Sequence, residues 1–374
     1  MKSLLLLIAL CVLSIFSSKV TAVNVTYISQ TRDLTPYWHN TYAVAKAAAK
    51  DLNITLTIIE GQGHHLYQAE VIKKLTLSPK KPDLLIFHAY KQNAQDYFKL
   101  LEQAQIPFVT YSNFSKNPAL PAHKPVGLPQ EKFKYWLSEH YVENTQGAAL
   151  LAKSLIGQSR ATKSSKDEIK VLALSGDLIA ESLERSEGVA LQIEQERNTI
   201  LMQDIVANWY AEDAQQKFKA LYARHNGIDV VWASSDTMAI GALAGAIELG
   251  LAPNKDIFIG GFDWDIEAIK KVKSGQLAAS AGGQFYNIAW LLVQVYDHFN
   301  NQVPFSSKTA KVADKYAVID QKNLKKLEPL TTLKSLSSIN FYCFTQSHTR
   351  KAEYDFSVDA LLKQTQKTSE KKCN

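Results

Sequence analysis

The fold is decided by residues 23–60, VNVTYISQTRDLTPYWHNTYAVAKAAAKDLNITLTIIE. Two short apolar runs rich in β-branched residues, 23–28 and 54–60, flank the alanine-rich segment 41–52, which has the composition of a helix. Neither run alternates strictly between apolar and polar residues, as is typical of parallel strands that helices cover on both faces. Strand, helix and strand in this order predict a right-handed crossover and a parallel sheet.

The same alternation of strand-like and helix-like segments continues along the chain in two blocks. The first block reaches residue 113 and is followed by the proline-rich stretch 117–130, which indicates a boundary or a long surface loop. The second block begins with IKVLALS at residues 169–175 and fades near residue 331. Two similar α/β halves are therefore expected, with residues 331–374 as a partly disordered appendage that holds one short helix near 358–364.

The N-terminus has the layout of a secretory signal peptide. Lys2 precedes an apolar run from Leu4 to Phe16, and small residues lead to Ala22. This run is shorter than a bilayer requires, which favours a signal peptide cleaved after Ala22 over an uncleaved anchor. Residues 1–22 are therefore predicted to be removed on export.

The composition excludes several other classes of protein. The formal charge of +6 is spread along 374 residues, so no concentrated basic face predicts nucleic-acid binding. After cleavage only Cys343 and Cys373 remain, so the fold does not rest on a disulfide framework, although these two can pair in an oxidising compartment. His64 and His65 have no accompanying ligands at zinc spacing, and no dinucleotide-binding or phosphate-binding motif occurs, so neither a metal nor a cofactor is predicted.

Ligands of open parallel sheets bind at the carboxyl ends of the strands. The residues just after the predicted strands are rich in aromatic, Asp, Asn, Arg and Ser side chains, but they contain no nucleophile–base–orienter set. We therefore expect a binding site and not an enzyme. Two rings, Tyr37 and Trp38, follow the first strand, where either helix–sheet packing or a stacking wall for a partly apolar ligand would explain them.

Six segments of the two blocks carry recognisable motifs in a fixed order. They are PYWHNTYAVAKAAAKDLNITLTIIE (36–60), IPFVTYSN (106–113), ENTQGAALLAKSLI (143–156), ERSEGVALQIEQ (184–195), WASSDTMAIGALAGAIELG (232–250) and IFIGGFDWDIEAIKKVKSGQLAASAGGQ (257–284). Over roughly residues 24–310 the chain resembles the type I periplasmic solute-binding proteins, above all those for pentoses and hexoses. The Tyr-Trp pair, Asn113 and Arg185 also resemble the members of this family that bind autoinducer-2.

The resemblance implies two doubly wound parallel-sheet lobes joined by a hinge of three chain crossings. Lobe one is expected over residues 23–113 and 284–306, and lobe two over residues 114–283 and 307–330. The lobes are expected to close on a sugar or sugar-like polar ligand, as a periplasmic monomer that delivers it to an ABC-type transporter. The same fold would suit a signal receptor that docks on a membrane sensor kinase, cyclase or chemoreceptor, and the sequence does not separate these partners.

The resemblance also implies which residues touch the ligand. They are Tyr37, Trp38, Asn113, Arg185, Ser235, Asp236, Asp263 and Gln284. Trp38 is expected to cover the C–H face of a sugar, while Tyr37 either shares this role or points into the core. Carboxylates at Asp236 and Asp263 would accept hydrogen bonds from hydroxyl groups, and Arg185 would donate them.

Three of these assignments have plainer alternatives. Asp236 could simply cap the helix that it opens, since Asp is favoured at that position. Arg185 could form a surface ion pair of little energetic weight. Trp264 or Asp265 could take the role assigned to Asp263, because all three follow the same strand.

Overall fold

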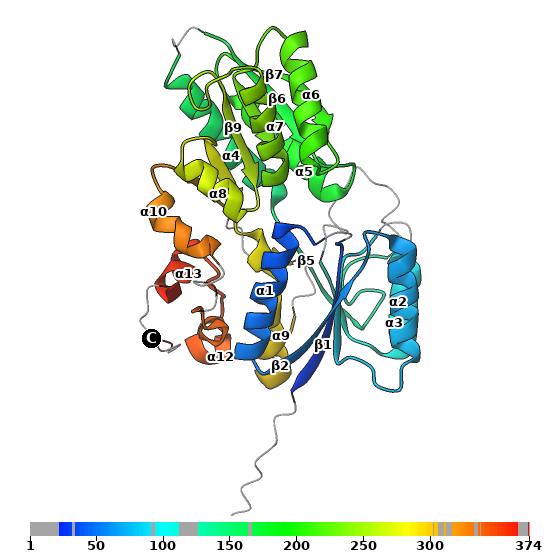
Figure 1. The fold of residues 1–374 in the computed structure, drawn as a ribbon. Helices are drawn as coiled ribbons and strands as arrows, with labels where there is room; N and C mark the ends of the chain where they lie inside the picture. Colours follow the sequence, from blue (N-terminus) through cyan, green and yellow to red (C-terminus); the bar gives the residue numbers. More distant parts are fainter. Residues whose placement is uncertain are drawn as a thin grey trace, which may run out of the picture.

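The structure is a computed structural model that describes residues 22–31, 34–90, 94–111, 126–163, 167–301, 303–305, 310–311, 316–332, 336, 338–365 and 373. It contains two six-stranded sheets, with the strand orders β11-β5-β4-β3-β1-β2 and β12-β10-β9-β8-β6-β7. Each sheet forms its own lobe with helices on both faces (Figure 1). The predicted two-lobe α/β architecture is therefore confirmed.

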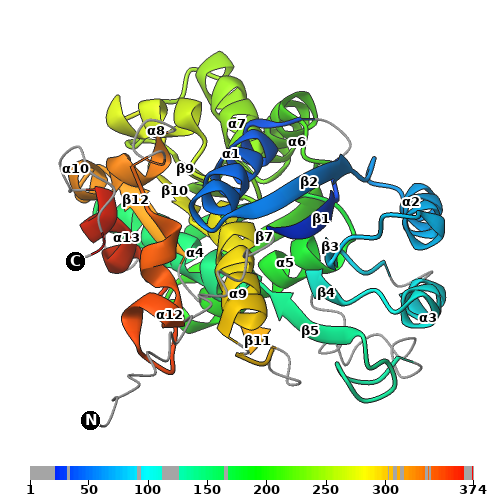
Figure 2. The same ribbon diagram turned by 90° about the horizontal axis from the view of Figure 1, so that it is seen from below.

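The first lobe is built on a fully parallel sheet. Its strands are β1 (Val23–Ser29), β2 (Ile54–Glu60), β3 (Leu84–Phe87), β4 (Phe108–Tyr111), β5 (Trp136–Tyr141) and β11 (Ala310–Lys311). Helices α1 (Pro36–Asp51) and α9 (Asn287–Asn301) cover one face, and α2 (His65–Leu77) and α3 (Ala94–Ala104) cover the other (Figure 2). All four residues of β3 are buried, as expected for a central strand covered on both sides.

The second lobe repeats this plan. Its strands are β6 (Ile169–Ser175), β7 (Thr199–Val206), β8 (Val230–Ala233), β9 (Phe258–Phe262), β10 (Ala279–Gly282) and β12 (Ala317–Asp320), of which β12 alone is antiparallel to its neighbour. Its helices are α4 (Asn144–Arg160), α5 (Ala180–Gln195), α6 (Ala211–Arg224), α7 (Asp236–Glu248) and α8 (Ile266–Lys273). The strand ends of both lobes are thus available to form one site between them.

The chain crosses between the lobes three times, but two predicted boundaries are wrong. Residue 114 does not begin lobe two, because β5 pairs with β4 in the first sheet and the first crossing comes at Val142 and Glu143. Residue 307 does not begin the last lobe-two segment either, because β11 pairs with β5 before the third crossing leads to β12. The proline-rich stretch is therefore an insertion between two strands of lobe one, and most of it lies outside the described residues.

The C-terminal region is packed against the lobes over most of its length. It contains α10 (Leu324–Leu327), the 3₁₀ turns η3 (Glu328–Thr331) and η4 (Phe341–Phe344), α12 (Gln346–Thr349) and α13 (Val358–Thr365). The short helix predicted near 358–364 is confirmed as α13. Residues 338–365 of the predicted appendage are an ordered part of the fold, because Phe341, Phe356 and Leu361 belong to the main hydrophobic core.

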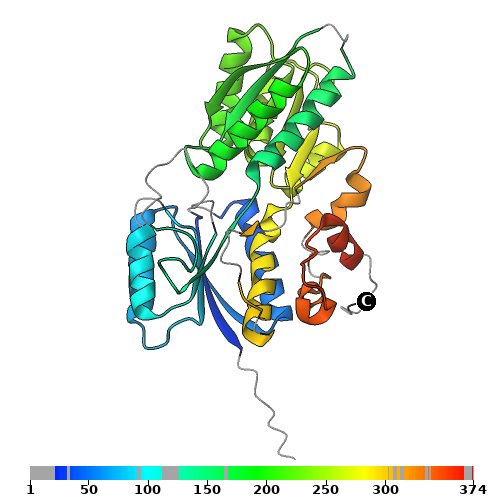
Figure 3. The same cartoon turned by 180° about the vertical axis from the view of Figure 1, so that it is seen from behind.

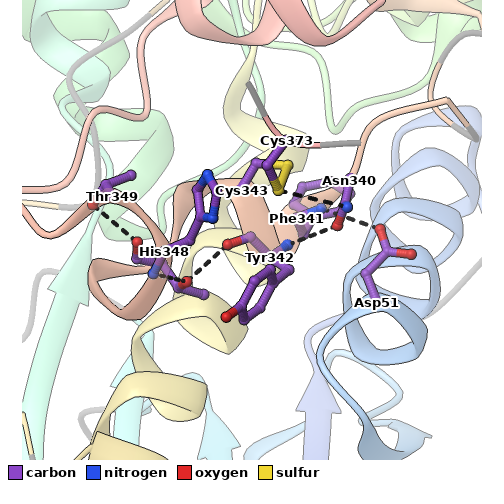
Figure 4. The surroundings of a disulfide bond; sticks show 9 residues. Asp51, Asn340, Phe341, Tyr342, Cys343, His348, Thr349 and Cys373 are labelled. Carbon is purple, nitrogen blue, oxygen red and sulfur yellow. Dashed lines mark hydrogen bonds between the residues drawn. A yellow bond between two sulfur atoms is a disulfide. The ribbon is translucent and has the colours of Figure 1, made fainter. Parts of the chain in front are cut away.

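Two other predictions on the termini concern residues at the edge of the described chain. Cys343 and Cys373 do pair in a disulfide, whose surroundings are shown in Figure 4. The signal peptide and the disorder expected at the C-terminus lie outside the described residues, at 1–21 and at 366–372 with 374. Among the residues that are described, no helix has both the length and the apolar character needed to cross a membrane.

Candidate ligand-binding site

Arg185 lies in the interior of the site and not on the surface. It projects from α5 and is 7% exposed. Its Nη1 donates to the Ser234 carbonyl oxygen at 2.5 Å, and its Nε donates to Asn144 Oδ1 at 3.2 Å. The guanidinium carbon lies 4.4 Å from the ring centroid of Phe262, in cation–π range. The alternative of a surface ion pair for Arg185 is therefore wrong.

Asp263 faces this cation from the loop after β9. Gln284 Nε2 donates to Asp263 Oδ1 at 2.6 Å. Burial raises the pKa of the Asp263 carboxyl to about 7, while the charge of Arg185 acts in the opposite direction. Asp263 and the following Trp264 both have positive φ, at 115° and 53°, a strained backbone that is typical of functional loops.

The Tyr37 ring reaches the same group of polar side chains from lobe one. Its hydroxyl lies within electrostatic range of the Tyr111 hydroxyl, which in turn neighbours the side chain of Asn287. Burial above all, followed by Tyr111, Tyr27 and Asp263, raises the pKa of Tyr37 well above its ordinary value. The structure thus brings Tyr37 and Asp263, from different lobes, into one site.

Trp38 lies beside Tyr37 but has a different environment. The two ring centroids are 5.1 Å apart in an edge-on arrangement, and Trp38 is 6.2 Å from the ring of Tyr42. Trp38 is half-buried and packs against the main core. Of the two rings, Tyr37 is the one that interacts electrostatically with Asp263 and Arg185.

Asp236 supports the site from behind. It is fully buried, and its Oδ2 accepts from the Asp265 backbone N–H and from Ser280 Oγ, both at 2.8 Å. The helix-capping alternative for Asp236 is wrong, because Ser235 is the N-cap of α7 and its Oγ accepts from the Met238 N–H at 3.2 Å. Asp236 therefore holds the loop that carries Asp263 in place.

The remaining predicted residues have varied positions. Gln284 is 4% exposed, and its Oε1 has no hydrogen-bond partner among the described residues. Trp264 is fully buried and its Nε1 donates to the Ser280 carbonyl oxygen at 3.2 Å, so it is part of the core and not a stacking platform. Asp265 caps α8 through the Glu267 N–H. Asn113 lies outside the described residues.

Several residues of the site were not selected from the sequence. Tyr316, which precedes β12, donates from its hydroxyl to Asn144 Oδ1 at 2.9 Å. Trp209, which follows β7, lies 6.0 Å from the guanidinium of Arg185. Trp209 could have been selected from the sequence, because it follows a predicted strand. Tyr316 could not, because its place in the site depends on the third chain crossing, which no local sequence pattern marks.

One further contact joins the two lobes directly. His88, after β3, has its Nδ1 3.4 Å from Glu181 Oε1, in the first turn of α5. The same nitrogen lies 3.2 Å from the carbonyl oxygen of Tyr111. Both neighbours are acceptors, so this nitrogen must carry the proton. Glu181 Oε2 is buried without a hydrogen-bond partner among the described residues.

Two α/β lobes, three crossings and a shared polar and aromatic site define a hinged two-lobe binding protein. Residues 25–299 match the family described as "Periplasmic binding protein domain". The match covers most of the chain, so the protein belongs to this family, whose members bind solutes, in agreement with the prediction that it is not an enzyme.

Solved structures of similar fold include three bacterial proteins. A periplasmic sugar-binding protein from Pseudomonas fluorescens has a TM-score of 0.78 at 19% identity, covering 91% of this chain and 99% of the other. An ABC transporter solute-binding protein from Actinobacillus succinogenes with bound D-allose has a TM-score of 0.66 at 21% identity, covering 81% and 99%. The arabinose-transporter binding protein from Shewanella with bound L-arabinofuranose has a TM-score of 0.66 at 17% identity, covering 83% and 98%. At these identities the likeness establishes the fold.

Proposed function

We propose that the protein closes on a sugar or polyol and delivers it to an ABC-type transporter. The observation that carries this proposal is the site between the lobes, where a buried cation, a carboxyl group and tyrosine hydroxyls lie close together beside aromatic rings. Hydroxyl groups of a polyol would pair with Asp263, Gln284 and Arg185, and the ring of Tyr37 would cover its C–H face. The ligands named for the structural neighbours, D-allose and L-arabinofuranose, belong to the same chemical class.

Closure would couple binding to delivery. A ligand that touches both lobes stabilises the closed arrangement by its extra contacts there, and the closed surface is what a membrane partner would bind. We further propose that the protein acts as a periplasmic monomer after cleavage at Ala22, which a mass measurement of the exported protein checks. Likeness to the autoinducer-2-binding members remains a prediction from sequence, and a sensor partner remains the alternative to a transporter.

A thermal-shift screen against monosaccharides and polyols tests the proposal. A ligand present at about 100 times its dissociation constant adds about 2.7 kcal/mol to the free energy of unfolding. We expect at least one pentose, hexose or cyclic polyol to raise the melting temperature. A panel that leaves the melting temperature unchanged, while other small polar molecules raise it, would point to a different ligand class.

The affinity for a polyol is expected to rise with pH, because the ionised Asp263 carboxylate accepts hydrogen bonds from hydroxyls more strongly than the neutral acid does. Its pKa is raised to about 7, so affinity should increase by at most about tenfold per pH unit below pH 7 and level off above it. Protonation of Asp263 is expected to lower the affinity but to raise the free energy of unfolding. The folded pKa exceeds the ordinary 3.8, so the contribution of neutral Asp263 is complete below about pH 4 and is lost as pH approaches 7.

Calorimetric titration across this pH range checks the prediction. The matched variant Asp263→Asn should bind weakly and with no step near pH 7. A wild-type affinity that is constant over the range would show that Asp263 does not receive the ligand's hydroxyl groups.

The rings of Tyr37 and Trp38, which follow β1, are expected to contribute unequally to ligand affinity. Tyr37→Ala should raise the dissociation constant by about 30-fold or more, because it removes both a stacking ring and a hydroxyl in the polar cluster. Trp38→Ala tests the original assignment of the platform, and a comparable loss of affinity in a protein that still folds would restore Trp38 to that role. Titrations of the two variants, with melting curves of both in the absence of ligand, separate loss of binding from loss of stability.

A further inference from the structure

The C-terminal strap, residues 338–365 together with Cys373, is anchored on lobe one. The ring of Phe356 stacks on Trp290 of α9, with centroids 4.5 Å apart and planes 10° from parallel. Asp297, also on α9, accepts from the backbone N–H groups of Gln346 at 2.7 Å and Ser347 at 3.1 Å. On α1, Asp51 accepts from the backbone N–H of Phe341 at 3.1 Å, as Figure 4 shows.

The same strap also packs against segments that belong to lobe two. Helix α13 packs on η3, which follows β12 of the second sheet. Glu328 of η3 pairs with Lys273 of α8 at 2.9 Å, and Lys326 pairs with Asp359 of α13 at 3.1 Å. Both pairs are exposed and contribute little, so the link rests mainly on the buried Leu330, Leu361 and Leu362. The strap is therefore attached to both lobes.

The strap lies beside the hinge and away from α2 and α3, as Figures 1 and 3 agree. It lines a small hollow beside the hinge. Each chain crossing contributes a residue to its lining, namely Val142, Gln284 and Tyr316, and the strap contributes Phe356, Val358 and Leu361. Asn287 also lines this hollow, so the strap and two residues of the candidate ligand site, Gln284 and Asn287, share one lining.

We propose that the C-terminal strap is a hinge brace that sets the balance between open and closed lobes. The arrangement seen here has both the strap contacts and the His88–Glu181 contact across the cleft. Contacts that exist in this arrangement stabilise it relative to arrangements in which the lobes have rotated apart. Phe356 is thus a positioning residue, which acts on the ligand through the hinge and through Gln284 and Asn287.

The disulfide strengthens this brace. Cys343 lies in η4 on lobe one, and Cys373 lies eight residues after Thr365, the last residue of α13. The bond closes a span of 30 residues around Phe356 and α13, which restricts the detached conformations of the strap. Reduction should therefore loosen the strap while both sheets remain folded.

Small-angle X-ray scattering of the ligand-free full chain tests the proposal. Phe356→Ala should give a larger radius of gyration than the wild type, because the lobes spend more time apart. Phe133→Ala is the matched control, since Phe133 is similarly buried but packs against Phe98 in a separate core cluster of lobe one. This control should lose stability without a change in the radius of gyration.

A second variant keeps the test decisive if Phe356→Ala fails to fold. Replacement of both Cys343 and Cys373 with serine should shift the radius of gyration in the same direction. Unchanged scattering in the folded serine variant, whether or not Phe356→Ala folds, would overturn the brace. The effect on affinity rests on the proposed function, but the scattering needs no ligand, so a protein that binds no sugar could still show the brace.

Discussion

Arg185→Met is expected to weaken ligand binding by about 100-fold or more. The substitution removes a buried cation that is held by two hydrogen bonds and stacked over Phe262, and truncating one member of such a charged cluster costs about 2–5 kcal/mol. It also leaves the Ser234 carbonyl oxygen without its donor. Because Arg185 holds down the pKa of Asp263, the pH at which affinity levels off should move upward in the variant.

The matched control is Arg160→Met. Arg160 lies at the end of α4 and donates to the backbone carbonyl oxygens of Asp167, Arg197 and Asn198 on the far side of lobe two. This variant should lose some stability and keep its affinity. Calorimetry on both proteins decides the matter, and equal affinities for the two variants would remove Arg185 from the site.

Asp236→Ala is expected to lower the free energy of unfolding by about 3 kcal/mol. It leaves the Asp265 N–H buried without an acceptor and the Ser280 hydroxyl with only a long contact of 3.5 Å to the Ala281 carbonyl oxygen, and an unsatisfied buried group costs about 1–3 kcal/mol. Ligand affinity should fall as well, since the loop with Asp263 loses its support. The isosteric Asp236→Asn keeps one acceptor oxygen and should lose clearly less stability.

Urea unfolding of the two variants measures this difference. If alanine and asparagine at this position are equally stable, the two hydrogen bonds do not determine stability. If stability falls as expected but the affinity stays that of the wild type, then Asp236 supports the fold and not the geometry of the site.

The sequence allowed most of the fold to be predicted, and the exceptions have physical causes. Regular strand–helix alternation marked both sheets, because strands covered on both faces are continuous apolar runs. The strand β5, WLSEHY, contains buried charged and polar residues after a proline-rich insertion, so it lacked that signal. The two-residue strand β11 is too short to carry any pattern.

The site was predictable where residues follow strands and less so elsewhere. Arg185 and Asp263 were selected from the resemblance to the family, and Asp263 also directly follows a strand; the structure places them together. The roles of Ser235 and Asp236 could not be separated, because a shift of one residue at a helix start exchanges cap and first turn. The position of Tyr316 in the site and the packing of the strap depend on contacts between segments far apart in the sequence. Local hydrophobic periodicity does not predict such contacts.

Isothermal titration calorimetry of the wild-type protein with monosaccharides and polyols tests the central claim most directly. We predict saturable one-to-one binding of at least one of them, at an affinity that falls sharply in Arg185→Met and not in Arg160→Met. The account would be contradicted if the folded wild-type protein bound none of them, or if a bound sugar were held equally well by both variants.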